Sequence, residues 1–196
     1  MKPTECLRSR RPRRRSRQAR HASRRTGLPN IAARPASVND RTEPGHWEAD
    51  QIIGYRNRSS MLWLSERASR YSIGITMPCG YDADAMVAGL VEGLDQIPAH
   101  LRRSITFDPG SEWASWQTIA ATYGLDCWFC DPHAPWQRGQ IENLNRQWRW
   151  WFPRGTDLAS IAPTEVNRAA AIINGQRRRS LGYQSPAMLY AALTAR

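Results

Sequence analysis

The sequence lacks long apolar runs and is poor in cysteine and lysine. Apolar runs such as residues 61–64 and 127–130 are short, and no stretch approaches the roughly 18 uninterrupted apolar residues of a membrane span. The N-terminus has no apolar segment, so we expect no secretory signal. Of the four cysteines, Cys6 and Cys79 stand alone, which indicates no disulfide framework. We therefore expect a cytoplasmic protein without membrane contact.

Positive charge is concentrated at one end of the chain. Residues 1–41 hold thirteen basic residues and two acids, a balance equal to the formal net charge of +11 of the 196-residue chain. Lys2 is the only lysine, so every other positive charge is an arginine guanidinium, which can bind phosphate oxygens in a bidentate way. A segment this rich in arginine has no apolar surface to bury, and its like charges repel one another. We predict a mostly disordered Arg-rich arm over residues 1–44, either a solvated linker or, as we favour, a segment that follows nucleic-acid phosphates.

The remaining residues, 45–196, predict one folded domain. The chain is 41% hydrophobic, enough for a packed core. Apolar runs and alternation predict strands over residues 47–54, 61–65, 71–77, 104–107 and 125–130. Apolar stripes and cap residues predict helices over about residues 82–97, 111–120, 137–151 and 163–174, and another from residue 185. This order predicts an α/β fold in which helices flank a mixed sheet.

Three acidic residues stand apart from the other acids by their positions. Asp50 lies within a predicted strand, Asp108 ends another, and Glu142 lies on a predicted helix. The first and fourth strands of such a sheet can be neighbours, which would bring Asp50 close to Asp108. Close carboxylates repel unless a cation lies between them, and carboxylate oxygens suit Mg²⁺. Taken separately, Asp108 is equally explained as a turn or cap residue, and Asp50 as a satisfied edge-strand acid.

The predicted helix around Glu142 has two faces. Residues 141, 144, 148 and 151 form a core-facing stripe, whereas Glu142, Asn145, Arg146 and Arg149 share a polar face. An i,i+4 Glu–Arg pair explains this polar face as well as a metal ligand beside phosphate-binding arginines does. Spacing alone does not decide between them.

Together, these residues resemble the catalytic core of bacterial DDE-type transposases, most closely the insertion sequence IS30 family within the retroviral-integrase-like superfamily. The resemblance covers about residues 30–192. The matching segments are GHWEAD (45–50), TFDPGSE (106–112), FCDPHAPWQRGQIEN (129–143), FPRGTDL (152–158) and RRSLGY (178–183). Thirty-three residues separate Asp108 from Glu142, and Arg149 follows seven positions after Glu142, as the family pattern expects.

The resemblance implies a ribonuclease-H-like fold and an enzyme that cuts and joins DNA strands during transposition. It implies that Asp50, Asp108 and Glu142 hold two Mg²⁺ or Mn²⁺ ions as the catalytic triad, with no small-molecule cofactor. The implied partners are element-end and target DNA, with a homo-oligomer assembled on DNA at the bacterial nucleoid. From the resemblance together with the charge and position of these residues, we predict DNA binding by His133, Trp136, Arg138, Asn145, Arg146, Arg149, Arg177, Arg178 and Arg179.

Three features depart from the family pattern. Ala49 stands where the family usually has glycine. Pro109 stands where it usually has asparagine, and proline removes a backbone donor beside Asp108. The helix-turn-helix segments that precede the core in relatives are replaced by the Arg-rich arm, which predicts an N-terminally truncated copy. The alternative function is therefore a catalytically impaired DNA-binding remnant, and a weaker third is an RNA-acting nuclease on the same fold.

Other candidate sites carry less weight. Cys127 and Cys130 with His133 offer too few ligands for structural zinc, so we predict packing roles for the cysteines. His133 is equally explained by a hydrogen bond that stabilises its loop, and the arginines at 177–179 by a solvated surface. Nine tryptophans could stack on bases. Their positions favour core packing for Trp47, Trp63, Trp113, Trp148 and Trp151, and leave Trp136 as the candidate for DNA contact.

Overall fold

The computed structural model describes residues 27–78, 80, 82–132 and 134–195. The strands are β1 (His46–Ile53), β2 (Ser60–Glu66), β3 (Ser72–Met77), β4 (Ser104–Phe107) and β5 (Asp126–Phe129). The α-helices are α2 (Ala36–Asn39), α3 (Ala83–Asp95), α4 (Trp116–Tyr123), α5 (Gly139–Trp151), α6 (Pro163–Gly175) and α7 (Pro186–Thr194). Short 3-10 helices are η2 (Ile31–Ala33), η3 (Tyr55–Asn57), η4 (Ala99–Leu101), η5 (Ser111–Trp113), η6 (Pro135–Arg138), η7 (Leu158–Ser160) and η8 (Arg179–Leu181).

The five strands form one mixed sheet in the order β3-β2-β1-β4-β5. β1, β2 and β3 pair in antiparallel fashion, because short turns join them, whereas β4 and β5 are parallel to β1 after helical crossovers. This order confirms the predicted neighbourhood of the first and fourth strands. It also confirms the predicted α/β class and is compatible with a ribonuclease-H-like core.

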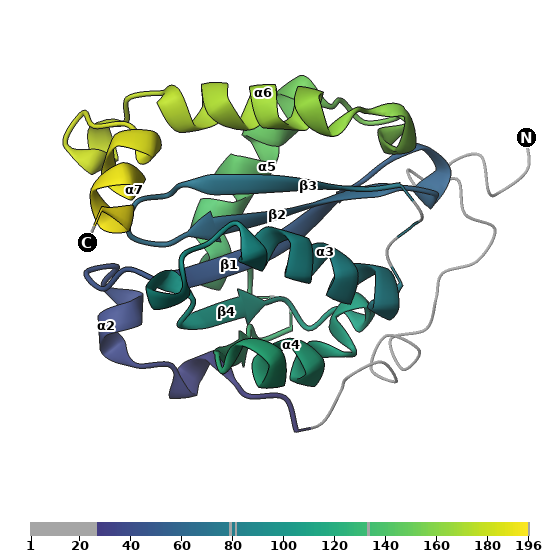
Figure 1. The fold of residues 1–196 in the computed structure, drawn as a ribbon. Coiled ribbons are helices and arrows are strands. Elements are labelled where there is room, and N and C mark those ends of the chain that lie inside the picture. The colour runs from purple at the N-terminus through teal and green to yellow at the C-terminus, as the bar shows by residue number, and fades with distance from the viewer. Residues whose placement is uncertain (1–26, 79, 81, 133, 196) are drawn as a thin grey trace, which may run out of the picture.

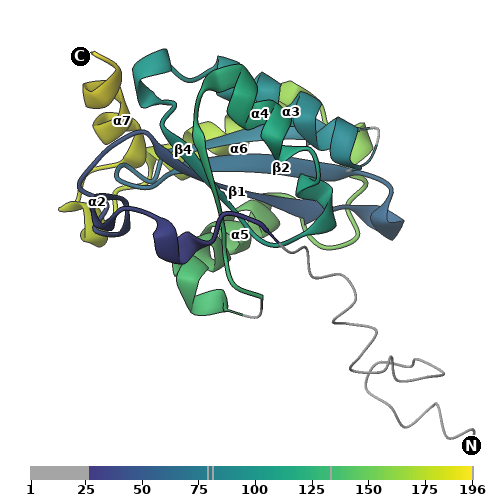
Figure 2. The same ribbon diagram turned by 90° about the horizontal axis from the view of Figure 1, so that it is seen from below.

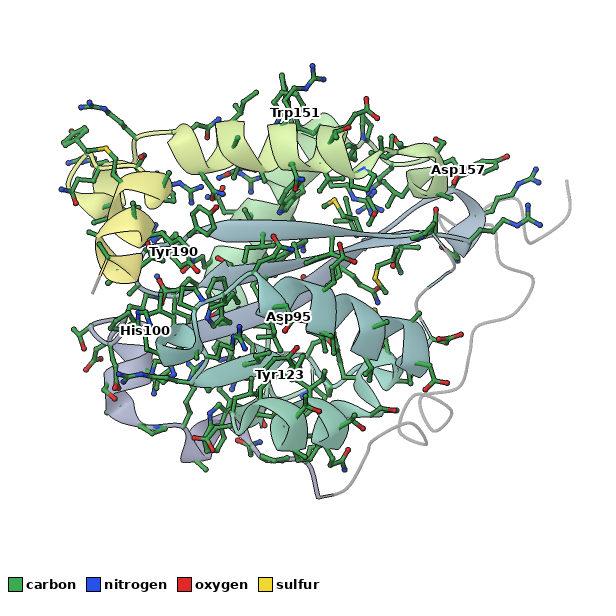
Figure 3. The ribbon with its side chains drawn as sticks, in the orientation of Figure 1. Asp95, His100, Tyr123, Trp151, Asp157 and Tyr190 are labelled. Atoms are coloured by element: carbon green, nitrogen blue, oxygen red, sulfur yellow. The ribbon has the colours of Figure 1, made fainter. Side chains whose placement is uncertain are left out.

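Helices cover both faces of the sheet (Figures 1 and 2). One core lies between the sheet and α3 and α4, with Trp47, Leu62 and Leu64 fully buried in it. The other lies beneath α5 and α6 and contains Trp63. Because both faces are covered, β2 is buried throughout, and its central residues 61–64 are a continuous apolar run rather than an alternating pattern. The hydrogen bond of 2.8 Å from the Tyr123 hydroxyl to Asp95 ties α4 to α3 (Figure 3).

Residues 27–44, which the sequence assigns to the arm, pack against the sheet. Val38 is buried, and Arg34 is buried and donates to the Thr106 hydroxyl at 3.0 Å. The backbone of Asn30 forms a bridge with Phe129 at the sheet edge. Apolar residues interspersed among the arginines explain this packing, because they give the segment something to bury. Residues 1–26, the most basic part of the predicted arm, lie outside the described residues, so disorder there and the boundary at residue 44 stay predictions.

None of the helices in the described part of the chain combines the length and apolar character that a membrane crossing requires.

Helices α5 and α6 approach the sheet closely at Gly74 of β3. A methyl group on Gly74 would lie 2.7 Å from Cγ1 of Val166 and 2.8 Å from Cη2 of Trp148. Both contacts are closer than carbon atoms tolerate, and the buried Trp148 ring has little freedom to move. Glycine at position 74 therefore sets the distance between β3 and the helix that carries Glu142.

We expect Gly74→Ala to lower the free energy of unfolding by about 1–3 kcal/mol, because overpacking must push α5 or α6 outward. Urea unfolding of the full chain measures this loss. Gly175→Ala is the matched control, since nothing lies within 4 Å of a methyl group there. Equal stability of both variants and the parent chain would contradict the close packing.

Candidate active site

Asp50, within β1, and Asp108, directly after the last residue of β4, lie near each other where the pairing of these two parallel strands ends. The β1–β4 register pairs His46 with Ser104 and Glu48 with Thr106. Continued by two residues, this register places Asp50 opposite Asp108. Residues with even numbers on β1 face α5, so the Asp50 carboxylate points toward that helix.

The guanidinium group of Arg138 bridges the two carboxylates. Its Nη2 lies 3.6 Å from Oδ2 of Asp50, and its Nη1 lies 3.5 Å from Oδ2 of Asp108. Nη2 also donates to the Ala49 carbonyl at 2.7 Å. Arg138 reaches both strands because η6, which directly precedes α5, places it beside Ala49 and Asp50 in the middle of β1. The two acids predicted to converge therefore do so around one cationic group.

Two contacts fix the Asp50 carboxylate. Its Oδ1 accepts from the backbone N–H of Gln51 at 2.9 Å, and its Oδ2 accepts from the Asn145 side-chain amide at 2.8 Å. The Asn145 carbonyl oxygen accepts in turn from the Trp63 indole at 2.9 Å. Burial raises the pKa of Asp50 above its usual range, whereas Arg138 and these hydrogen bonds oppose that shift.

The Asp108 carboxylate is held through its other oxygen. Oδ1 accepts from the Trp113 indole at 2.6 Å and from the Gly110 backbone N–H at 3.1 Å. The second contact is a turn in which an aspartate caps the residue two positions later. The donors are the Trp113 indole and the backbone N–H of residue 110, so Pro109 removes neither hydrogen bond.

Glu142 lies in the first turn of α5 and its side chain is exposed. Among the described residues, no hydrogen bond or ion pair joins it to Asp50, Asp108 or Arg146. The structure therefore brings two of the three predicted acids into one contact network and leaves the third apart. Asn145, one turn later on the same side of α5, does contact Asp50.

The other predicted DNA-binding residues are distributed unevenly. Trp136, Arg146, Arg177 and Arg179 are exposed, Trp136 at 77%. Arg149 and Arg178 instead turn inward, and burial lowers the pKa of both guanidinium groups. Arg149 donates to the Ile53 carbonyl at 2.9 Å, and Arg178 to Gln147 and the Ile173 carbonyl, each at 3.2 Å. His133 lies outside the described residues.

The predicted packing roles of the tryptophans and cysteines agree with the structure. Trp47, Trp63, Trp113 and Trp148 are buried, and Trp151 is partly buried against the α5–α6 core. Cys127 and Cys130 are free, buried thiols, and burial raises the pKa of Cys127 to about 12. Two features escaped the sequence analysis: Trp113 also donates to Asp108, and Trp150 on α5 is 74% exposed. The only sequence signal for the contact of Trp113 with Asp108 is that this tryptophan follows the aspartate by five residues.

The donor set at this site suits a hard divalent cation. The carboxylates of Asp50 and Asp108 each turn Oδ2 toward the Arg138 guanidinium, and carboxylate oxygens are the protein ligands that Mg²⁺ and Mn²⁺ prefer. Within the described residues, no three His, Cys, Asp or Glu side chains lie close enough together to hold a metal ion. The site therefore offers two ligands, with Glu142 available from α5 only after its side chain moves.

Comparison with known proteins places the chain among transposases, although no family model matches it. It is 40% identical over 193 residues to the transposase for insertion sequence element IS1086 of Cupriavidus metallidurans, covering 97% of this chain and 56% of that protein. It is 35% identical over 184 residues to the transposase InsI for insertion sequence element IS30A of Escherichia coli, covering 88% and 48%.

A more distant relative, the transposase for insertion sequence element IS4351 of Bacteroides fragilis, is 29% identical over 160 residues, which are 82% of this chain. The chain spans about half the length of these curated relatives. The predicted truncation stays a prediction. The identities over most of the chain confirm the resemblance drawn from the sequence motifs: this chain belongs to the IS30 family of insertion-sequence transposases.

Proposed function

We propose that this chain is the catalytic core of a transposase that cleaves and joins DNA strands by cation-dependent phosphoryl transfer. The observation that carries the proposal is the convergence of Asp50 and Asp108 on neighbouring parallel strands, in a chain of this family. Water would attack a phosphodiester bond at the element's end, and the freed 3′-OH would then attack target DNA. Both steps exchange one P–O bond for another.

The Mg²⁺ or Mn²⁺ ions would be held by Asp50, Asp108 and Glu142. By analogy with other phosphoryl-transfer sites, we propose two ions. Bound ions would neutralise charge on the attacking and leaving oxygens. Glu142 would have to turn from its exposed position toward Asp50, the side of α5 on which Asn145 already lies.

The surrounding residues supply positioning. Asn145 and the Gln51 backbone hold the Asp50 carboxylate, and Trp113 with the Gly110 backbone holds that of Asp108. Donors fixed in a partly buried site need no reorganisation during reaction, which is the largest advantage a protein gives phosphoryl transfer.

The proposed partner is DNA, and we propose that this chain binds it as a homo-oligomer. The exposed residues Trp136, Arg146, Arg177 and Arg179 would contact it, with the basic residues on phosphates and Trp136 on a base or sugar. Arg149 and Arg178 are less suited to this task because their guanidinium groups already bind carbonyl oxygens of the protein.

A branched oligonucleotide that mimics the joined product tests the chemistry without element-end recognition, because strand joining is reversible. We expect the full chain to resolve this substrate in Mg²⁺ or Mn²⁺ and not in EDTA. Asp108→Asn should be inactive while keeping its fold, since asparagine still accepts from Trp113 through Oδ1. Equal resolution by both proteins, or resolution in EDTA, would refute the proposal.

A catalytically impaired DNA-binding remnant is the second candidate function. It is favoured by the position of Glu142, which lies apart from the two aspartates, whereas Pro109 removes no described hydrogen bond of Asp108. Salt-dependent DNA binding without resolution in any divalent metal would support it. The variant Pro109→Asn tests whether the proline impairs activity. Because Pro109 removes no described hydrogen bond of Asp108, we expect this variant to change activity less than about threefold.

A further inference from the structure

The two aspartates share one pattern of contacts. Each carboxylate accepts a hydrogen bond through Oδ1, from Gln51 at Asp50 and from Trp113 at Asp108, and each turns Oδ2 toward the Arg138 guanidinium. The Oδ2 of Asp50 also accepts from Asn145 at 2.8 Å. The Arg138 side chain is only 12% exposed, compared with 16% for Asp50 and 36% for Asp108. Arg138 is therefore packed between the carboxylates rather than lying on the surface above them.

The guanidinium stands where a shared cation would bind. A divalent ion ligated by both Oδ2 atoms would sit about 2.0–2.2 Å from each. The Nη atoms of Arg138 lie 3.6 and 3.5 Å from the same two oxygens, so an ion placed between either oxygen and the guanidinium would overlap a guanidinium nitrogen. Their positive charges would also repel each other across a few ångströms.

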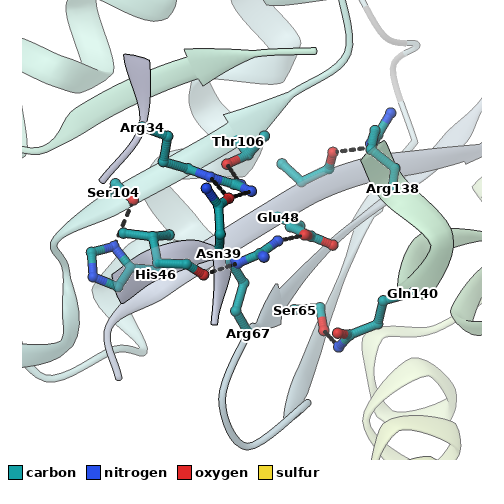
Figure 4. A network of polar contacts seen from close by, with 12 residues as sticks. Arg34, Asn39, His46, Glu48, Ser65, Arg67, Ser104, Thr106, Arg138 and Gln140 are labelled. Atoms are coloured by element: carbon teal, nitrogen blue, oxygen red, sulfur yellow. Dashed lines mark hydrogen bonds and ion pairs between the residues drawn. The ribbon is translucent and has the colours of Figure 1, made fainter. Parts of the chain in front are cut away.

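The hold on Arg138 is incomplete. Its Nη2 donates to the Ala49 carbonyl, a contact visible in Figure 4. Its Nε, however, is buried and has no hydrogen-bond partner within the described residues. A buried donor without a partner costs free energy, which reduces the net stability of this arrangement.

We infer that Arg138 is a positioning residue that takes the place of the divalent cation in the metal-free site and is displaced when the cation binds. This inference rests on the proposed function, because it assumes that Asp50 and Asp108 bind the cation. Arg138 holds the two carboxylates together against their repulsion. Its release on cation binding frees one guanidinium beside the reacting phosphate, the partner that an unpaired arginine prefers.

Cation binding without DNA tests this exchange directly. We expect Arg138→Gln to bind Mn²⁺ about tenfold more tightly than the parent chain, as measured by electron paramagnetic resonance of free Mn²⁺, because no guanidinium competes for the site. Arg168→Gln is the matched control: it removes the same charge from an exposed position of α6 and should leave Mn²⁺ affinity unchanged. Arg138→Lys keeps a positive charge, so its Mn²⁺ affinity should lie between those of Arg138→Gln and the parent chain.

A second measurement does not depend on the fold of a variant. The Arg138 Nε–H resonance of the parent chain should shift on titration with Mg²⁺, and Asp50→Asn should abolish the shift. Equal Mn²⁺ affinity of Arg138→Gln and the parent chain, with binding lost in Asp50→Asn, would overturn the exchange and leave the proposed function standing. Binding in none of the proteins would overturn both.

Discussion

Glu142→Gln should reduce resolution of the branched substrate by about 10³-fold or more, the scale of loss when an essential catalytic group is removed. The amide is a poor ligand for a divalent cation, whereas the carboxylate is a strong one. The melting temperature should stay unchanged, because the Glu142 side chain is exposed and no described contact depends on it.

Glu92→Gln is the matched control for Glu142→Gln, since Glu92 is an exposed acid on α3. It should keep full activity. A Glu142→Gln protein that resolves the substrate at the parent rate would show that two aspartates suffice, or that the chemistry is different. Loss of activity together with a lower melting temperature would instead indicate a structural role for Glu142.

Sequence patterns predicted the elements well because the patterns report burial directly. The stripe on α5 placed Ile141, Leu144 and Trp148 inward, and all three are buried. The order of strands predicted the neighbourhood of Asp50 and Asp108, since it makes the first and fourth strands neighbours in the sheet. These features follow from periodicity and connectivity, which a single sequence contains.

Contacts of the long polar side chains could not be predicted in the same way. The spacing of Arg149 from Glu142 is equally suited to binding phosphate and to binding the Ile53 carbonyl, and the structure has the second. An arginine can extend several ångströms in many directions, so its partner depends on strand register and helix depth. Arg138 illustrates this, because the last residue of η6 reaches both Asp50 within β1 and Asp108 after β4.

The same reason hid the most buried ion pair of the described residues. Glu48 of β1 and Arg67, just after β2, form an ion pair with side chains only 2% and 4% exposed. Arg67 Nε also donates to the Val38 carbonyl at 3.0 Å, which joins residues 27–44 to the sheet (Figure 4). Glu48 precedes Asp50 by two residues on the same side of β1, so this pair supports the strand that positions the candidate site.

Glu48→Ala should lower the free energy of unfolding by about 3–5 kcal/mol, because it leaves the Arg67 guanidinium buried without its counter-charge. The double variant Glu48→Leu/Arg67→Met should recover most of this loss, since two apolar side chains of similar volume bury no charge. Urea unfolding of the full chain measures both changes, provided that the unfolding free energy depends equally steeply on urea concentration in all the proteins compared. Arg103→Ala breaks the exposed Arg103–Glu43 pair and should cost far less.

A double variant no more stable than Glu48→Ala would contradict this account, because it would mean that hydrogen bonding or packing at these positions, not uncompensated charge, sets the loss. The pair also links stability to the site. Where Glu48→Ala remains folded, weaker docking of residues 27–44 should loosen the start of β1, while Asp50 keeps its contacts with Asn145 and Gln51. The free energy of Mn²⁺ binding should therefore fall less than the free energy of unfolding. Equal losses of the two free energies would mean that the Glu48–Arg67 pair is part of the cation site itself.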